Sequence, residues 1–111
     1  MNVYHGHVYF DLAQLPLAEQ VRTSLATALP QLTYNGQPIT RPIGPHTKPM
    51  FEIHFYAQDL STVLNKLETL RMGLSVLLHP VQRDELAAHT SKAQWLGQKL
   101  ELKLEVLTSG D

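Results

Sequence analysis

The sequence predicts an α+β protein in which short strands alternate with two longer helices, and three observations indicate this. Apolar and polar residues alternate over residues 3–11 and 50–56, which is the period of a half-buried strand. Apolar residues recur at helical spacing in 16–29 and again in 60–70. Proline, glycine and an Asn-Gly pair separate these runs, so each run ends at a recognisable turn or stop.

The first half begins with the predicted strand 3–11. Val8 and Phe10 share one face of this strand. The opposite face carries His5, His7 and Tyr9. A helix follows, because Pro16 suits a first helical turn and Pro30 cannot continue the helix.

Residues 31–49 are the least regular segment. The pair Asn35-Gly36 predicts a turn, with a short strand on either side of it. A proline-rich loop follows and carries His46.

The second half is more regular. In the predicted strand 50–56 one face carries Phe51, Ile53 and Phe55, and the other carries Glu52, His54 and Tyr56. Asp59 is a suitable N-cap for the helix 60–70, and Gly73 is a plausible stop. A strand over 75–79 ends at His79. A short helix over about 84–95 and a last strand over 99–107, with alternating leucines, complete the prediction.

This order of elements is typical of a ferredoxin-like sandwich, an antiparallel sheet with both long helices on one face. The short helix and the last strand are a C-terminal addition. We expect a single domain over residues 1–111, since the length suits one modest core.

The strand alternation places polar side chains on the face without helices: His5, His7, Tyr9, Glu52, His54, Tyr56 and His79. Several imidazoles and a carboxylate there would suit iron(II), zinc or manganese, and two histidines with one carboxylate is a non-haem iron arrangement. Three other interpretations remain open. The histidines could be a solvated face, Glu52 could form an ordinary ion pair, and the aromatic residues could cover a dimer interface.

Composition limits the partners. The formal net charge is -1 and basic residues are scattered, so we expect no nucleic-acid partner. No apolar run is long enough for a membrane span. The absence of cysteine excludes disulfides and thiolate ligands and fits a cytoplasmic protein, and no signal peptide is recognisable.

Four motifs occur in order: "HGHVYFD", "GPHTKPMFEIHF", "LSVLLHP" and "AAHTSKAQWLG". Together they resemble the DOPA 4,5-dioxygenase family, in its branch of small fungal and bacterial proteins. The resemblance runs from about His5 to Gly97. It implies a ferredoxin-like fold and extradiol cleavage of a catechol such as L-DOPA by O2 at a non-haem iron(II), a site that zinc can occupy in a purified protein.

The resemblance also suggests roles for individual residues. The family's histidines fall on His5, His7, His46, His79 and His89, whereas His54 has no counterpart in the pattern. We expect His7, His46 and His79 as metal ligands, with Glu52 as the possible carboxylate. His89 and His5 are expected in proton transfer. The residue before the last histidine is commonly acidic in the family but is Ala88 here, and Asp84 or Glu85 could replace it.

Other features of the substrate site stay open. Tyr9 and Trp95 could stack on the aromatic ring or merely pack in the core. A substrate carboxylate needs a cation, for which Arg41, Arg71 and Arg83 are candidates. We also expect a homodimer, formed through the helix-free sheet face or the strand 99–107. The alternative function is a non-catalytic dimer that binds a small molecule or metal through a histidine-rich sheet face.

Overall fold

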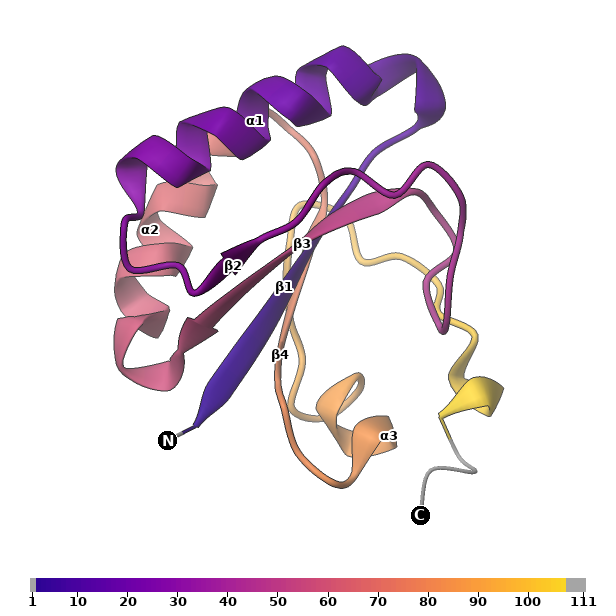
Figure 1. Cartoon of the computed structure of the whole chain (residues 1–111). Coiled ribbons are helices and arrows are strands. Elements are labelled where there is room, and N and C mark those ends of the chain that lie inside the picture. Colours follow the sequence, from indigo (N-terminus) through magenta and orange to yellow (C-terminus); the bar gives the residue numbers. More distant parts are fainter. Residues whose placement is uncertain (1, 108–111) are drawn as a thin grey trace.

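The computed structural model describes residues 2–107 and confirms the predicted α+β fold. Its centre is a five-stranded antiparallel sheet with strand order β2-β3-β1-β4-β5 (Figure 1). The strands are β1 (Val3–Tyr9), β2 (Tyr34–Asn35), β3 (Met50–Tyr56), β4 (Val76–Pro80) and β5 (Gln94–Leu96). The helices are α1 (Leu15–Ala28), α2 (Leu60–Leu70) and the short α3 (Glu85–Ala88). Three 3-10 turns, Leu12–Gln14, Ala57–Asp59 and Leu104–Val106, complete the elements.

The main core lies between one sheet face and the two long helices. Val8, Phe51 and Val76 from the three central strands are fully buried there with Val21 of α1 and Val63 of α2. Residues two apart along a strand share a face, so the alternation of apolar and polar residues places the apolar side chains on the face toward the helices. Pro16 lies in the first turn of α1 as predicted, and Gly73, just beyond α2, has a positive φ of 82°. Asp59 directly precedes α2, but its side chain makes no capping hydrogen bond, because the residue belongs to the 3-10 turn that leads into the helix.

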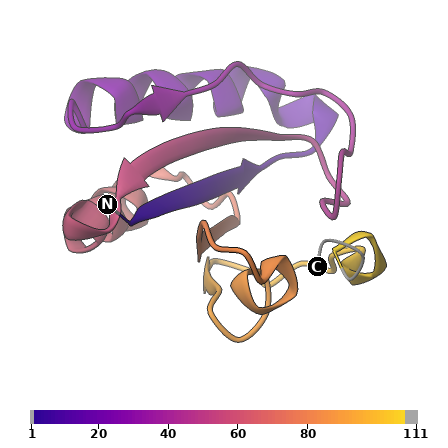
Figure 2. The ribbon, with the colours of Figure 1, turned by 60° about the horizontal axis from the view of Figure 1, so that its bottom comes forward.

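The other sheet face has no long helix, as predicted, but it is covered. Tyr9, Met50 and Leu77 form a second buried cluster on this side, and Trp95 and Leu102 pack against it. Figure 2 shows α3 and the C-terminal segment on the side of the sheet away from α1. His7 and His79 of this face are therefore buried, whereas His5 and His54 stay partly exposed.

The predicted strand 99–107 is wrong. Residues 98–107 contain one isolated bridge, between His46 and Leu102, and the turn Leu104–Val106. The edge of β4 is instead paired by β5, which falls where the helix 84–95 was expected to end. The alternating leucines reflect a different contact, since Leu100 and Leu102 face the second cluster while the segment crosses the sheet face. The strand edge expected to hold a dimer partner is consequently not there.

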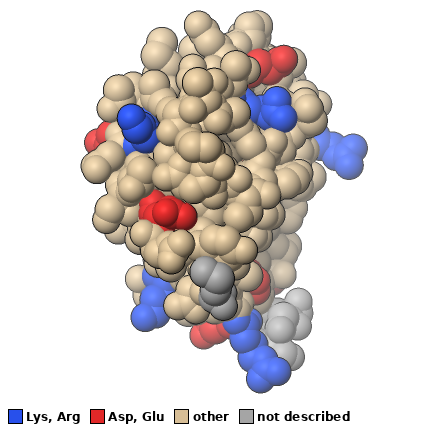
Figure 3. All heavy atoms as spheres, turned by 60° about the vertical axis from the view of Figure 1, so that its left-hand side comes forward, with Lys and Arg blue, Asp and Glu red and all other residues tan. Residues whose placement is uncertain are grey.

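The surface carries few charged groups. On the face in Figure 3, lysine, arginine and acidic side chains are scattered among uncharged residues. Within residues 2–107, no helix has the length and apolar character needed to cross a membrane.

Candidate metal centre

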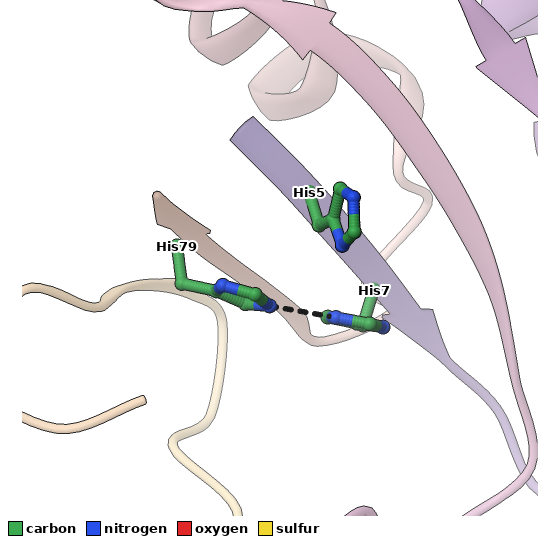
Figure 4. Close-up of side chains that lie close together, drawn as sticks. All are labelled: His5, His7 and His79. Carbon is green, nitrogen blue, oxygen red and sulfur yellow. Dashed lines mark hydrogen bonds between the residues drawn. The ribbon is translucent and has the colours of Figure 1, made fainter. Parts of the chain in front are cut away.

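The sheet register brings three histidines of the helix-free face together. On β1, His5 pairs with His54 of β3 on one side and with His79 of β4 on the other. His7 lies two residues further along the same face. Figure 4 shows the side chains of His5, His7 and His79 pointing toward one another from the two neighbouring strands. The closest approach joins Nε2 of His7 to Nε2 of His79 at 3.0 Å.

Two more imidazoles come from outside the strands. His46 belongs to the loop before β3, and its ring centroid lies 4.1 Å from that of His7. His89 caps the C-terminal end of α3, and its ring centroid lies 4.0 Å from that of His79. Asp84 accepts a hydrogen bond from the Ala87 amide and so fixes the start of this one-turn helix.

Ring nitrogens of these residues form two overlapping sets that could each hold one metal ion, with donor atoms within 4.8 Å of one another. The first set is His5, His7 and His79, and the second is His7, His46 and His89. His7 belongs to both. All members except the half-buried His5 are buried, with side chains that solvent hardly reaches.

Backbone carbonyls fix the tautomers of two of these rings. His79 Nδ1 donates to the carbonyl of Pro80 at 3.0 Å, and His89 Nδ1 donates to the carbonyl of Glu85 at 2.8 Å. In a neutral imidazole the other nitrogen then carries no proton. The Nε2 lone pairs of both rings are thus available to a metal ion, and a hydrogen bond of this kind is typical of metal-binding histidines.

The contact between His7 and His79 joins two neutral rings, and their tautomers conflict. Because His79 Nε2 carries no proton, His7 Nε2 must donate to it, which leaves His7 Nδ1 bare. This Nδ1 is buried without a hydrogen-bond partner among the described residues, and Glu52 Oε1 faces it at 3.5 Å. If the proton moved to Nδ1, the two Nε2 lone pairs would instead repel each other. Each tautomer of His7 therefore leaves one unfavourable contact: Nδ1 against Glu52 in the first, and Nε2 against Nε2 of His79 in the second.

A metal ion removes this conflict. Two nitrogens bound to one ion at about 2.1 Å and at right angles are about 3 Å apart, close to the observed separation of His7 and His79. The residues present therefore fit a metal whose preferred ligands are imidazoles, such as zinc or iron(II).

Burial keeps four of the five imidazoles, those of His5, His7, His46 and His79, uncharged. Desolvation, helped by the neighbouring imidazoles, holds the pKa of His7 well below its usual value. It lowers the pKa of His46 and of His79 to about 4. The pKa of His5 is also lowered, first by burial and then by the nearby His54. Neutral imidazoles at pH 7 offer lone pairs to a cation without first losing protons.

Glu52 lies at one side of the cluster. It accepts a hydrogen bond from His54 Nε2, and its carboxylate is 3.7 Å from His5 Nδ1. The rings of His5 and His54 stack at 3.8 Å. Glu52 was expected as a ligand beside His7, and it faces the Nδ1 atom of that ring, not the Nε2 atom that approaches His79. With His5 and His54 it forms a third set of side chains that could hold a metal ion.

Two cavities adjoin the cluster. A smaller one of about 180 Å³ is bordered by all five imidazoles of the two metal sets. A larger one of about 440 Å³ is lined by Trp95, Lys99 and three leucines. His89 borders both cavities, so it separates the metal-binding space from a space with the size and apolar walls of a ligand pocket.

The structure resolves several alternatives left open by the sequence. Tyr9 packs: it is buried, its hydroxyl is hydrogen bonded to His46 Nδ1 at 2.8 Å, and burial raises its pKa. Trp95 stacks on Tyr9 and also lines the larger cavity. Glu85 orients His89, mainly through its backbone carbonyl, with its carboxylate 3.7 Å away.

The cation beside the larger cavity is a lysine that sequence reasoning missed. Arg71 donates hydrogen bonds to Glu68 and to the Leu74 carbonyl, and none of the three candidate arginines lines either cavity. Lys99 lines the cavity instead. Its segment was misread as a strand, so no signal in the pattern pointed to it.

Comparison with known proteins identifies the group to which this arrangement belongs. The model of the Dopa 4,5-dioxygenase family matches residues 4–106, nearly all of the described chain. The chain belongs to the Dopa 4,5-dioxygenase family. The family consists of enzymes, and the match includes all five histidines of the cluster.

Individual relatives agree with this assignment. DOPA 4,5-dioxygenase of Amanita muscaria is 29% identical over 91% of this chain and 47% of that protein. An uncharacterized 21.2 kDa protein of Botryotinia fuckeliana is 34% identical over 60% of this chain and 40% of that protein. The chain spans about half the length of these relatives or less. A crystal structure from Nostoc punctiforme, named a "putative dioxygenase", matches with a TM-score of 0.90 and 34% identity over 98% of this chain and 93% of that one.

Proposed function

We propose that the protein is an iron(II)-dependent extradiol dioxygenase that opens the ring of a catechol such as L-DOPA with O2. The observation that carries the proposal is the buried group of neutral imidazoles whose free lone pairs converge beside a cavity of about 440 Å³. Membership of the Dopa 4,5-dioxygenase family supports the reaction class. When bound, iron(II) supplies a redox-active centre at which a catecholate and dioxygen can react, which zinc cannot supply.

Three histidines are proposed as the ligands: His7, His46 and His79. His7 belongs to both imidazole sets, whereas His79 belongs to the first and His46 to the second. His7 and His79 already stand at the separation of neighbouring ligands, and the His46 ring lies against that of His7. Three imidazoles leave positions open for substrate and dioxygen.

His89 is proposed as the group that takes a proton from the catechol. It borders both cavities, so it can reach an aromatic hydroxyl next to the metal-binding space. Its Nδ1 proton is held by the Glu85 carbonyl, which leaves Nε2 ready to accept a proton. His5, half-buried at the edge of the cluster, would pass protons toward solvent.

The larger cavity is proposed to hold the aromatic ring. Trp95 and the leucines of residues 100–104 provide apolar walls that exclude water from the ring. Lys99 is placed to attract a substrate carboxylate, in the role first sought among the arginines.

Single histidine variants test this division of roles. Replacing His7, His46 or His79 by alanine should remove iron and oxygen uptake together, because a lost ligand acts on metal binding first. His89→Ala should keep iron but lower turnover by roughly 10²–10⁴-fold, the usual contribution of a general base. The measurements are iron content after anaerobic loading, oxygen uptake, and growth of a yellow ring-opened product from L-DOPA, caffeate or protocatechuate.

Two results would contradict the proposal. If the iron-loaded protein consumes no oxygen with any of these catechols, the alternative of a non-catalytic binding protein is favoured. If His89→Ala loses iron as readily as His7→Ala, then His89 is a ligand in the second imidazole set. Glu19→Gln, on the exposed side of α1, serves as the control and should change neither iron content nor turnover.

The proposal extends to the setting of the protein. A reducing compartment such as the cytoplasm would keep the iron in its ferrous state. A homodimer stays a prediction. Residues 99–107 form no strand that could pair with a partner, and the second cluster covers part of the sheet face, while His5, Glu52 and His54 remain partly exposed.

A further inference from the structure

The unsatisfied Nδ1 atom of His7 points to a role for Glu52. In a metal-free His7–His79 pair the proton sits on His7 Nε2, and Nδ1 confronts the Glu52 carboxylate with no proton between them. A buried polar atom without a hydrogen-bond partner is unfavourable, so this arrangement is disfavoured without a cation.

We propose that Glu52 is a positioning residue that holds the metal-binding tautomer of His7 and is not itself a metal ligand. When Nε2 of His7 binds an ion, the ring proton resides on Nδ1, where Glu52 Oε1 at 3.5 Å can accept it. The same change that fills the metal site therefore satisfies the one buried nitrogen of His7 that has no partner. The inference rests on the proposed function only in taking His7 as a ligand.

The surroundings of Glu52 suit this role. Its other oxygen accepts a hydrogen bond from His54 Nε2, so the side chain is held by a neighbour on the same strand and face. His7 and Glu52 are directly opposite one another in the β1–β3 register, which fixes the approach of the carboxylate through the two backbones. A carboxylate that orients a metal-binding imidazole in this way raises the basicity of the ligand nitrogen.

The first test uses the unmodified protein. Zinc is a suitable probe because it is stable in air and the readout needs no turnover. We expect ¹⁵N NMR to find the His7 proton on Nε2 in the metal-free protein and on Nδ1 in the zinc-loaded protein, with the Nδ1 proton protected from exchange with water. A zinc ion bound to Nδ1 of His7, or a carboxylate oxygen of Glu52 among the zinc ligands in X-ray absorption and a crystal structure, would overturn the proposal.

The second test uses the variant Glu52→Gln, which keeps the shape but removes the charge. Zinc affinity from competition with a chelator should fall by about 10–100-fold, because the neutral amide oxygen is a weaker acceptor for the Nδ1 proton of His7 than the carboxylate. His7→Ala should lower the zinc affinity further. Glu19→Gln, the same chemical change on α1, should keep the zinc affinity of the unmodified protein. An unchanged zinc affinity in a folded Glu52→Gln protein, or a loss equal to that of His7→Ala, would refute the positioning role.

These outcomes are independent of the dioxygenase reaction. Zinc affinity and the His7 tautomer can be as expected in a protein that oxidises no catechol, and oxygen uptake can occur in a protein whose Glu52 is a direct ligand. Circular dichroism and thermal melting establish that each variant is folded before its affinity is compared.

Discussion

Three of the four buried imidazoles of the cluster have a hydrogen-bond partner at Nδ1. A backbone carbonyl fixes the tautomer of His79 and of His89, and the Tyr9 hydroxyl contacts Nδ1 of His46. Burial then keeps the rings of His46 and His79 neutral near pH 7. The cluster is thus prepared for a cation at the level of individual atoms.

Stability of the metal-free protein should depend on pH through these rings. In the unfolded chain histidine takes up a proton near pH 6.5, whereas His46 and His79 in the folded protein do so only near pH 4. Between these values the unfolded state binds more protons, so the free energy of unfolding falls as pH falls and levels off below about pH 4. Each ring should account for roughly 3 kcal/mol across this window.

Urea unfolding of the metal-free protein at half-unit steps from pH 7 to 4 measures this dependence. The variant His79→Asn lacks one of the shifted groups, and its stability should decline less steeply over the same range. A free energy of unfolding that stays constant between pH 6.5 and 4.5 would be inconsistent with buried neutral histidines.

Only some of these histidines could be placed in the fold from the sequence pattern. Alternation with a period of two is a local property, so His7 and His79 could be assigned to one face from the strands alone. His46 and His89 lie in a loop and at a helix end, where no periodicity fixes direction, and they were suggested only by resemblance to a family. The hydrogen-bond partners on backbone carbonyls leave no trace in the sequence.

At the scale of elements, one face of β1 contributes to the histidine cluster and the other to the main core. The strand lies between β3 and β4, and it carries His5 and His7 on one face and the core residue Val8 on the other. Gly6 lies on the core side between the two histidines. A methyl group there would come within 2.9 Å of Ile53 Cγ1, closer than normal packing allows.

Gly6→Ala should therefore destabilise the protein by about 1–3 kcal/mol, the usual cost of overpacking a core, although alanine is normally favoured over glycine in a strand. Thermal or urea unfolding measures the change. In the double variant Gly6→Ala, Ile53→Val, the loss of stability should be smaller than the sum of the two single losses, because the shorter valine leaves room for the added methyl group. Additive losses would show that contact with Ile53 is not the cause.

The misread element was the segment 98–107. Its alternating leucines are typical of a strand, yet only its contacts reveal that it crosses the sheet face. Backbone and side-chain hydrogen bonds join it to the His46 loop: Thr47 Oγ1 donates to the Glu101 carbonyl, and the Lys103 amide donates to the Pro45 carbonyl. Such long-range contacts decide whether an alternating sequence forms a strand or an irregular segment that crosses the sheet face.

At the scale of the whole molecule, a rigid layer holds most of the histidines and a looser layer covers them. The sheet and the two long helices enclose the main core, whereas residues 98–107 are attached by a few hydrogen bonds and side chains of the second cluster. Segments with few buried contacts open at low free energy. The covering segment is therefore expected to open before the sheet does.

Hydrogen exchange tests this layered stability. Amides of β1, β3 and β4 should exchange slowly, and amides of 98–107 should exchange faster. Zinc should slow exchange in the covering segment and the His46 loop if His46 is a ligand, while α1 serves as the internal control. Uniform slowing across all elements would instead indicate that metal binding stabilises only the global fold.

The two rings of the cluster in closest contact come from distant parts of the chain, and this separation has a consequence for the timing of metal capture. His7 and His79 are 72 positions apart. At a synthesis rate of about 5–20 residues per second, the second ring leaves the ribosome roughly 4–14 s after the first. A nascent chain thus presents isolated imidazoles for seconds, during which any transient metal binding is weak and exchangeable. The identity of the resident ion is then set after synthesis, by the metal pool that surrounds the completed sheet.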